Sequence, residues 1–249
     1  MVDIHSHILW GLDDGARTLE QSLSMLGIAA KFGTTDIVAT PHANYRYSFE
    51  PSRVAQRVEE ISKGTGNRPT VHTGCDFHLS FDNIQDALEN PAKYAINSGP
   101  YLLVEFPDTA LTGMASALTA LVQRGLIPVM THPERQPVLS QVPADFMEWI
   151  QMGCLVQVTA QSLLGRFGRH AEESAWEMIR RGLAHIVASD AHDEKDRTPR
   201  LDQAFDAVVS RMGPAHAQLL FVDNPKAVIS GGSIAREIPK RLSRFRLWK

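Results

Sequence analysis

The chain has 249 residues, of which 43% are hydrophobic and 21% charged, and these proportions are ordinary for one globular domain of moderate size. Its formal net charge of −3 provides no overall basic field, so nucleic acid is not an expected partner. The N-terminus lacks the basic and apolar regions of a signal peptide, so we expect none. No apolar run reaches 18 residues, so we expect no transmembrane segment.

Seven short apolar runs, rich in β-branched residues, predict strands. In chain order they are residues 1–7, 35–42, 70–77, 101–106, 127–132, 155–160 and 185–192. Between them, apolar residues at i, i+3, i+4 and i+7 and a nearby terminal glycine predict helices. The clearest of these helical segments are residues 18–33, 51–64, 113–125 and 173–182.

The alternation of strand and helix predicts parallel strands joined by crossover helices. The strand runs are apolar on both faces, as is typical of strands that are covered on both sides. We therefore expect a single α/β domain over residues 1–230. Seven strand–helix units favour a barrel, with an open, doubly wound sheet as the alternative.

Residues 231–249 form a basic C-terminal tail and are not expected to be a separate domain. The stretch AREIPKRLSRFRLWK (235–249) has spaced apolar residues and is compatible with an amphipathic helix. Two interpretations are open. The tail either packs on the barrel or serves as an element that docks on a partner or on a membrane surface.

Six of the seven predicted strands end in residue types that bind metal ions. These residues are His5, His7, His42, Asp76, Glu105, His132, Asp190 and His192. Each histidine taken alone is more often a hydrogen-bonded core or rim residue than a metal ligand. However, the carboxyl ends of all strands in a parallel barrel face the same mouth, where such folds carry their active sites. Together these residues predict a multinuclear metal centre.

The chemistry of these side chains narrows the kind of ion. Carboxylates within apolar runs, such as Glu105 and Asp190, are costly unless they are paired or bound to a metal. Mixed oxygen and imidazole ligands exclude a thiolate zinc finger and suit Mn, Fe or Zn. The remaining histidines, His72, His170, His185 and His216, are expected to be structural or exposed. Cys75 and Cys154 lie in apolar segments and predict buried thiols in a reducing cytoplasm.

Two arginines lie on the loops that follow these ligands. Arg135 is three residues beyond His132, and Arg197 is five residues beyond His192. A guanidinium group is a rigid, permanently charged fork that matches two phosphate oxygens. The sequence therefore indicates a phosphorylated substrate, polarised by metals and held by arginines. The alternative is that each arginine pairs with a neighbouring acid, Glu134 or Asp196.

The motifs as a set resemble a known family. They are DIHSHILWGLDDGA, TPH, GCDFH, LVEF, THPER, QVTA, ASDAHD and FVDNP, in this order. Up to about residue 230 the chain resembles the polymerase-and-histidinol-phosphatase (PHP) superfamily. More narrowly, it is similar to the PHP-type protein-tyrosine phosphatases encoded with bacterial capsule and exopolysaccharide machinery. HSH alone is a weak signal, whereas HSH with DDG, THPER and ASDAH followed by an arginine is specific to that branch.

This resemblance implies a distorted (β/α)7 barrel with three metal ions, most often Mn²⁺. The implied ligands of the first ion are His5, His7 and Asp190, with Asp76 and Glu105 shared or bridging. Those of the second are Glu105, His132 and His192, and those of the third are His42 with Asp14 or its neighbour Asp13. Arg135 and Arg197 fall where this branch has its phosphate-binding arginines.

The implied substrate is phosphotyrosine in the tyrosine-rich tail of a bacterial tyrosine autokinase that regulates polysaccharide chain length and export. A phenolate, with a pKa near 10, is a fair leaving group, so general-acid help from His42 or His192 could be slight. The C-x5-R loop of thiol-based tyrosine phosphatases is absent, since Phe81 and Ala160 stand six residues after Cys75 and Cys154.

The chain departs from the family pattern at two positions. Asp76 stands where relatives usually have glutamate, and one methylene less could prevent it from bridging two ions unless His78 compensates. The stretch TPHAN lacks the basic pair that often follows this histidine, which could change how a peptide is held.

Three rival functions share these features. They are a PHP phosphatase of a small phosphomonoester such as histidinol phosphate, a PHP exonuclease and a non-catalytic binding module. The DDG motif and the two arginines favour the protein phosphatase. The negative net charge argues against the exonuclease. Every ligand position retains a metal-binding residue, which argues against a binding module that has lost its catalytic metal site. The sequence leaves the ion and the oligomeric state open, and an oligomer is compatible with it.

Overall fold

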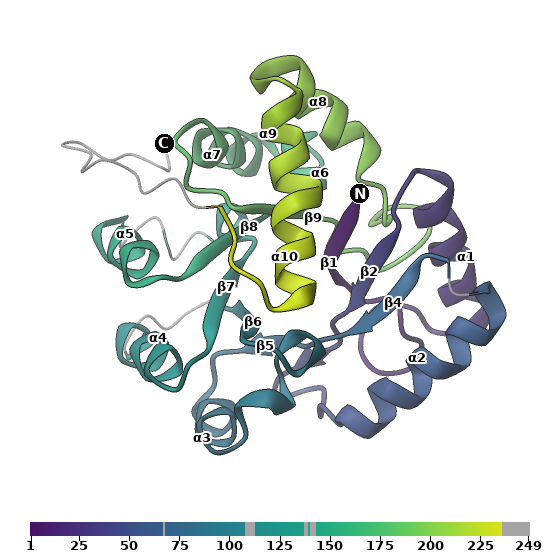
Figure 1. Cartoon of the computed structure of the whole chain (residues 1–249), viewed down its shortest axis with the longest axis horizontal. Helices are drawn as coiled ribbons and strands as arrows, with labels where there is room; N and C mark the ends of the chain where they lie inside the picture. Colours follow the sequence, from purple (N-terminus) through teal and green to yellow (C-terminus); the bar gives the residue numbers. More distant parts are fainter. Residues whose placement is uncertain (67, 108–112, 137–138, 140–142, 236–249) are drawn as a thin grey trace.

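The structure is a computed structural model that describes residues 1–66, 68–107, 113–136, 139 and 143–235 (Figure 1). The strands are β1 (Val2–Ser6), β2 (Asp36–Ala39), β3 (His42–Ala43), β4 (Thr70–Thr73), β5 (Asp76–His78), β6 (Tyr101–Glu105), β7 (Ile127–Thr131), β8 (Leu155–Thr159) and β9 (Ile186–Ala188). The α-helices are α1 (Leu19–Lys31), α2 (Pro51–Thr65), α3 (Phe81–Glu89), α4 (Met114–Gln123), α5 (Pro143–Met152), α6 (Ala160–Leu163), α7 (Arg169–Arg180), α8 (Asp202–Met212), α9 (Pro214–Gln218) and α10 (Asn224–Ser230).

All seven predicted strands are confirmed, but two of them are divided. Residues 35–42 form β2 and β3, and residues 70–77 form β4 and β5. At the second division a Cβ atom on Gly74 would lie 2.8 Å from Cγ1 of Val38, so any larger residue would require this buried side chain to shift. The divisions carry the chain from the sheet β1-β2-β4 into the sheet β3-β5-β6-β7-β8-β9. As a result His42 and Asp76 become register partners on adjacent strands.

The strands form a ring. All paired strands are parallel. The first and last strands are also neighbours, since the amide of Asp190 donates to the carbonyl of His5 (2.9 Å) and the amide of His7 donates to the carbonyl of Ala191 (2.8 Å). Each of the seven strand segments therefore has a neighbour on both sides. This arrangement is the expected distorted (β/α)7 barrel and not an open sheet.

The outer layer is helical, as predicted. Figure 1 shows α1 to α5, α7 and α8 around the strands. The four helices predicted from periodicity correspond to α1, α2, α4 and α7. Glycines with positive φ follow three of them, Gly33, Gly125 and Gly182, whereas α2 continues through Gly64 and ends at the left-handed Gly66.

One end of the ring is covered by the segment that contains α9 and α10, which lies across the strands in Figure 1. Val228 of α10 belongs to the apolar cluster formed by Val2 and residues of the other strands. The hydroxyl of Tyr101, the first residue of β6, donates to the carbonyl of Gly232 (2.5 Å). This segment therefore covers the amino ends of the strands, so that their carboxyl ends remain available for a functional site.

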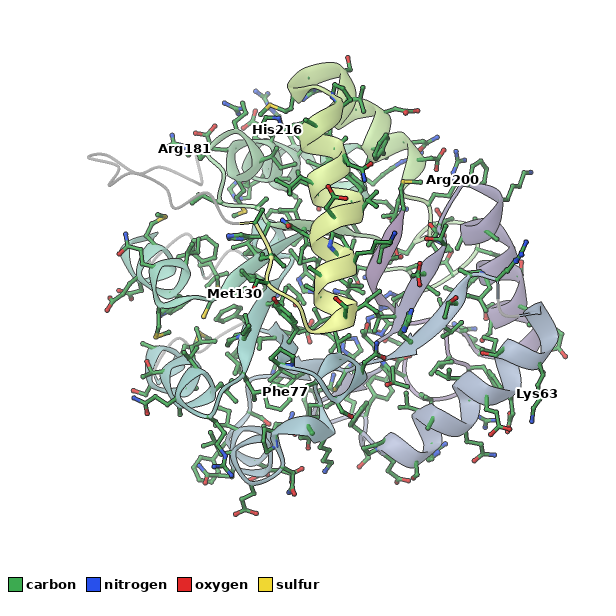
Figure 2. All side chains as sticks on the ribbon, viewed as in Figure 1. Lys63, Phe77, Met130, Arg181, Arg200 and His216 are labelled. Carbon is green, nitrogen blue, oxygen red and sulfur yellow. The ribbon has the colours of Figure 1, made fainter. Side chains whose placement is uncertain are left out.

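The core lies between the ring and the helices. Figure 2 shows Phe77 and Met130 among these elements, and both side chains are fully buried, whereas Lys63 lies at the periphery. None of the described helices is long and apolar enough to cross a membrane. Residues 236–249 are outside the described part of the chain, so both interpretations of the tail and the domain boundary stay predictions.

Candidate metal centre

Nine of the ten candidate ligands meet at the carboxyl ends of the strands. Among the described residues, four groups of side chains place their donor atoms within 4.8 Å of one another. The groups are His5, His7 and Asp190; His5, Asp76 and His132; His42, Asp76 and Glu105; and His7, Asp14, His42 and His192. Because the groups share members, they form one continuous centre. The tenth candidate, Asp13, lies outside all four groups.

The ligands implied for the first ion are brought together by the contact between the two ends of the ring. The Nε2 atoms of His5 and His7 are 3.3 Å apart, and each lies 3.5 Å from Oδ1 of Asp190. All three side chains are buried. Such a set of two imidazoles and one carboxylate can bind a divalent cation.

Asp76 gives the most direct indication of a cation. Its side chain is completely buried, and neither carboxylate oxygen has a hydrogen-bond partner among the described residues. Oδ2 lies 3.5 Å from Nε2 of His5 and 3.2 Å from Nδ1 of His42. A buried carboxylate without hydrogen bonds is costly unless it is neutralised by a positive group. The residues present therefore fit a bound metal ion.

Asp76 also takes part in two of the four groups despite its short side chain. It lies with His5 and His132 in one group and with His42 and Glu105 in another. The Asp76 carboxylate thus lies close to the donor atoms of two neighbouring groups of candidate ligands. His78, which could have compensated, belongs to none of the four groups, and its Nδ1 lies 3.7 Å from Oε2 of Glu105.

His192 lies with different neighbours from those that the resemblance implies. Its Nε2 is 3.6 Å from Oδ1 of Asp14, and Nε2 of His42 is 3.5 Å from the same oxygen. His132 is instead grouped with His5 and Asp76. The geometry therefore associates His192 with the third implied ion and not with the second. Asp14 is 53% exposed and forms the open side of the centre.

Asp13 orients other groups in this geometry. Its Oδ2 accepts hydrogen bonds from Nδ1 of His7 (2.6 Å) and from the amide of His42 (3.0 Å), and its Oδ1 accepts from the amide of Gly15 (3.0 Å). The first bond directs Nε2 of His7 towards the centre. Only glycine fits at position 15, because a Cβ atom would lie 2.1 Å from the carbonyl oxygen of His7.

Two buried polar residues on the strands support the ligands and were missed in the sequence. Oε1 of Gln157 lies 2.8 Å from Nδ1 of His5, which leaves Nε2 of His5 facing the carboxylates. Oδ1 of Asp3 accepts from the amide of Ser189 (3.0 Å), next to Asp190, and burial raises the pKa of Asp3 to about 6. The available signal was a polar residue inside an apolar strand, which requires a partner when buried.

The carboxylates and imidazoles of the centre favour each other's charged forms. Burial by itself lowers the pKa of His5 and His42, but nearby carboxylates, Asp76 above all, outweigh it and raise these pKa values to about 9 and about 10. Burial by itself raises the pKa of Asp76 and Asp190, but the imidazoles hold both pKa values well below the usual range. Without a metal, the carboxylates therefore attract protons to these two histidines.

Two other histidines are kept neutral. Burial is the largest cause that lowers the pKa of His132 to about 3, and the positive charge of Arg135 adds to it. Burial, followed by His7, lowers the pKa of His192 to about 2. A neutral imidazole is the form that binds a metal ion.

Arg135 and Arg197 meet at the edge of the centre, and both donate to Oδ2 of Asp190, Arg197 at 2.6 Å. The expected alternative, in which Arg135 pairs with Glu134, is wrong. Glu134 is buried and accepts from the amide of Thr159 (3.0 Å) and from the hydroxyl of Ser162 (2.7 Å). Arg197 likewise forms an ion pair with Asp190, whereas the alternative had paired it with Asp196. The arginine side chains are 22% and 29% exposed, so a substrate can reach them.

A cleft of about 470 Å³ opens beside Asp14 and His192. The start of α1 lines it through Thr18 and Gln21, and Glu194 lines it from the loop after β9. Solvent and substrate can therefore approach Asp14 and His192, ligands of the third implied ion, from this side.

The residues placed outside the centre by their sequence positions do lie outside it. His72 contacts Asp36 (3.1 Å), His185 is buried, and His170 and His216 are exposed. Cys75 and Cys154 are buried, and burial raises the pKa of the Cys75 thiol well above its usual value. Such a thiol is a poor nucleophile.

Comparison with known proteins agrees with this geometry. The family model for capsular polysaccharide synthesis, CpsB/CapC, matches residues 1–230. The chain belongs to this family. It is 33% identical over 255 residues to CapC of Staphylococcus aureus, covering 100% of this chain and 98% of that protein. It is 30% identical over 239 residues to the tyrosine-protein phosphatase CpsB of Streptococcus pneumoniae, covering 92% of this chain and 98% of that protein.

A solved structure extends the likeness to three dimensions. It belongs to a study of YwqE from Bacillus subtilis and CpsB from Streptococcus pneumoniae, described as unique metal-dependent tyrosine phosphatases. The TM-score is 0.89 at 29% identity, over 98% of this chain and 100% of that one. This likeness shows that the chain shares the fold of that protein over nearly its whole length.

Metal binding should release protons and become tighter as the pH rises from about 6 to about 8. In the metal-free protein, His5 and His42 hold protons below pKa values of about 9 and about 10, and these protons must leave before the imidazoles coordinate a metal. Titration calorimetry with Mn²⁺ in two buffers of different ionisation enthalpy measures the release. The exposed variant His216→Gln should behave like the wild type. Binding heats that are independent of buffer, with an affinity independent of pH, would contradict this expectation.

Proposed function

We propose that this chain is a metal-dependent protein-tyrosine phosphatase that hydrolyses phosphotyrosine. The observation that carries the proposal is the placement of two arginines on Asp190, a carboxylate that also faces the imidazoles of His5 and His7. A phosphate group between cations and arginines would have its charge neutralised from both sides. CpsB, the relative of Streptococcus pneumoniae, is named a tyrosine-protein phosphatase, which supports the choice of substrate.

The proposed centre holds three divalent cations. The ligand sets are His5, His7 and Asp190; Asp76, Glu105 and His132; and Asp14, His42 and His192. Asp76 and Glu105 would be the carboxylates shared between neighbouring ions. Mn²⁺ is the preferred ion, and Fe and Zn suit the same oxygen and imidazole donors. Bound cations would polarise the phosphoryl oxygens and lower the pKa of water.

The chain's own residues supply binding and orientation. The guanidinium groups of Arg135 and Arg197 bind phosphate oxygens that face away from the ligands, through charge-assisted hydrogen bonds. His42 and His192 direct Nε2 towards Asp14, which favours a ligand role over the general-acid role considered from the sequence. The phenolate, with its pKa near 10, then leaves without strong help from an acid.

The proposed biological substrate is the phosphorylated tyrosine-rich tail of a bacterial tyrosine autokinase in the cytoplasm. The capsular polysaccharide family to which the chain belongs supports this partner. Two buried cysteines that are not joined by a disulfide are compatible with a reducing compartment. Histidinol phosphate or another small phosphomonoester is the alternative substrate, because it would use the same centre.

The function is tested with the purified full chain and a panel of phosphotyrosine peptide, phosphoserine peptide and histidinol phosphate. We expect hydrolysis of the phosphotyrosine peptide with Mn²⁺ and none after chelation. Metal analysis of the same preparation measures ion content. A protein that holds no transition metal and stays inert after metal addition would refute the enzymatic proposal. A strong preference for histidinol phosphate would select the small-molecule alternative.

Asp13 and Asp14 form a matched pair for testing the proposed ligands. Asp14→Asn should lower the number of bound ions per chain, because it replaces a carboxylate ligand of the third ion. Asp13→Asn should retain the number of ions but weaken their binding by about 10- to 100-fold, since Asp13 orients His7. Metal analysis and Mn²⁺ titration of both variants measure the difference. Loss of one ion in Asp13→Asn alone would reverse the two roles.

Arg135→Ala should lower kcat/KM for phosphotyrosine peptide on the order of 100-fold while leaving the metal content unchanged, because it removes a charged partner of the phosphate. Steady-state kinetics with metal analysis measure both quantities. Arg211→Ala is the control, since this arginine packs on Trp176, 4.1 Å from its ring centre. Metal loss in Arg135→Ala would mean that the arginine has a structural role instead.

A further inference from the structure

One aromatic ring lies beside both arginines of the candidate site. The centre of the Phe167 ring is 4.2 Å from Cζ of Arg135 and 5.9 Å from Cζ of Arg197. A cation within about 6 Å of a ring centre is attracted by the negative face of the ring. The two guanidinium groups thus share an aromatic neighbour as well as a carboxylate, Asp190.

Asp190 by itself is a poor anchor for both arginines. Its Oδ1 lies 3.5 Å from Nε2 of His5 and 3.5 Å from Nε2 of His7. A cation bound by these atoms would draw on the same negative charge that holds the arginines. Two guanidinium groups side by side also repel each other. A second anchor is therefore needed to keep the arginines together.

An aromatic ring suits this task better than a second acid. A carboxylate accepts strong hydrogen bonds from guanidinium N–H groups and would compete with phosphate for them. The face of a ring attracts the positive charge but leaves the N–H groups in the guanidinium plane free. The arginines can then be held in place and still bind phosphate oxygens.

The chain presents Phe167 from a short turn between α6 and α7. The amide of Gly165 donates to the carbonyl of Ser162 (3.0 Å), and the amide of Gly168 donates to the carbonyl of Gly165 (3.1 Å). Both glycines have positive φ, +73° and +89°, which other residues rarely adopt. The turn follows β8 and α6 directly, so the ring is fixed to the rim of the barrel.

We propose that Phe167 is a positioning residue for phosphate binding, whose ring holds the guanidinium groups of Arg135 and Arg197 in place beside the metal centre. The inference rests on the proposed function for the identity of the anion. It predicts that the aromatic character of residue 167, and not its volume alone, sets the affinity for phosphate.

The experiment compares Phe167→Leu, which keeps an apolar side chain without a ring, with Phe167→Trp, which keeps the ring. Phe32→Leu is the matched control, because it removes another ring that lies 3.6 Å from an arginine, Arg200, and neither residue belongs to the four ligand groups. The Mn²⁺-loaded full chain is titrated with inorganic phosphate in a calorimeter, and KM and kcat are measured with p-nitrophenyl phosphate. Metal content is determined for every variant.

We expect Phe167→Leu to raise the Kd of phosphate and the KM by about 2- to 30-fold, the range that corresponds to the strength of a cation–π contact. Phe167→Trp should stay within about twofold of the wild type, and metal content should not change. Wild-type phosphate affinity in Phe167→Leu, equal losses in the Leu and Trp variants, or loss of metal in Phe167→Leu would each overturn the proposal.

A second readout does not depend on activity or metal. In the metal-free protein, the side-chain Nε–H resonances of Arg135 and Arg197 should shift in Phe167→Leu because the ring current is lost, whereas that of Arg200 should not. Unshifted resonances would overturn the proposal. If the wild type binds phosphate but does not hydrolyse phosphotyrosine, the proposed function fails and phosphate binding still decides the role of Phe167. If it hydrolyses phosphotyrosine and Phe167→Leu is indistinguishable from the wild type, the inference alone fails.

Discussion

The fully buried carboxylate of Asp76 determines which groups can surround it at the carboxyl end of the barrel. Its two oxygens have no hydrogen-bond partner among the described residues, and the nearest positive groups are imidazoles more than 3 Å away. Transfer of such a group out of water is unfavourable unless positive charge compensates it. The same reasoning extends to Asp190, which is also buried. The carboxyl end of the barrel is therefore suited to bind cations. In their absence, the protons on His5 and His42 neutralise only part of the negative charge of the carboxylates.

The ligands are held by an unusual backbone and by buried hydrogen bonds. His132 and Asp190 both have positive φ, 36° and 53°, a conformation that costs about 1–3 kcal/mol for residues other than glycine and that clusters at functional sites. Asp13 and Gln157 fix the orientation of His7 and His5 through their Nδ1 atoms. This support reduces the rearrangement that metal binding requires.

Asp190 connects the two halves of the candidate site. One of its oxygens faces the imidazoles of His5 and His7, and the other receives both arginines. The candidate metal ligands and the two arginines therefore share one carboxylate. The ring of Phe167 is an uncharged contact of both arginines beside this shared carboxylate.

The sequence by itself determined the strand and helix order, because apolar periodicity is a local property and the chain alternates regularly. It also determined which residue types gather at the rim, since parallel strands place their carboxyl ends together. It did not determine which neighbours each ligand has. The division of two strands at Thr40–Pro41 and Gly74 pairs His42 with Asp76, and the contact between β1 and the residues after β9 brings His7 to Asp190.

Only the tertiary structure decided the roles of neighbouring residues with the same chemistry. Asp13 and Asp14 are identical in type and adjacent in sequence, yet the loop turns one towards Nδ1 of His7 and the other towards His42 and His192. Gln157 stood out in the sequence only as a polar residue inside an apolar strand, and Phe167 did not stand out, because an amide and a phenyl ring acquire a function only through what they contact. Those contacts join residues that are distant in the chain, and local sequence carries no information about such distances.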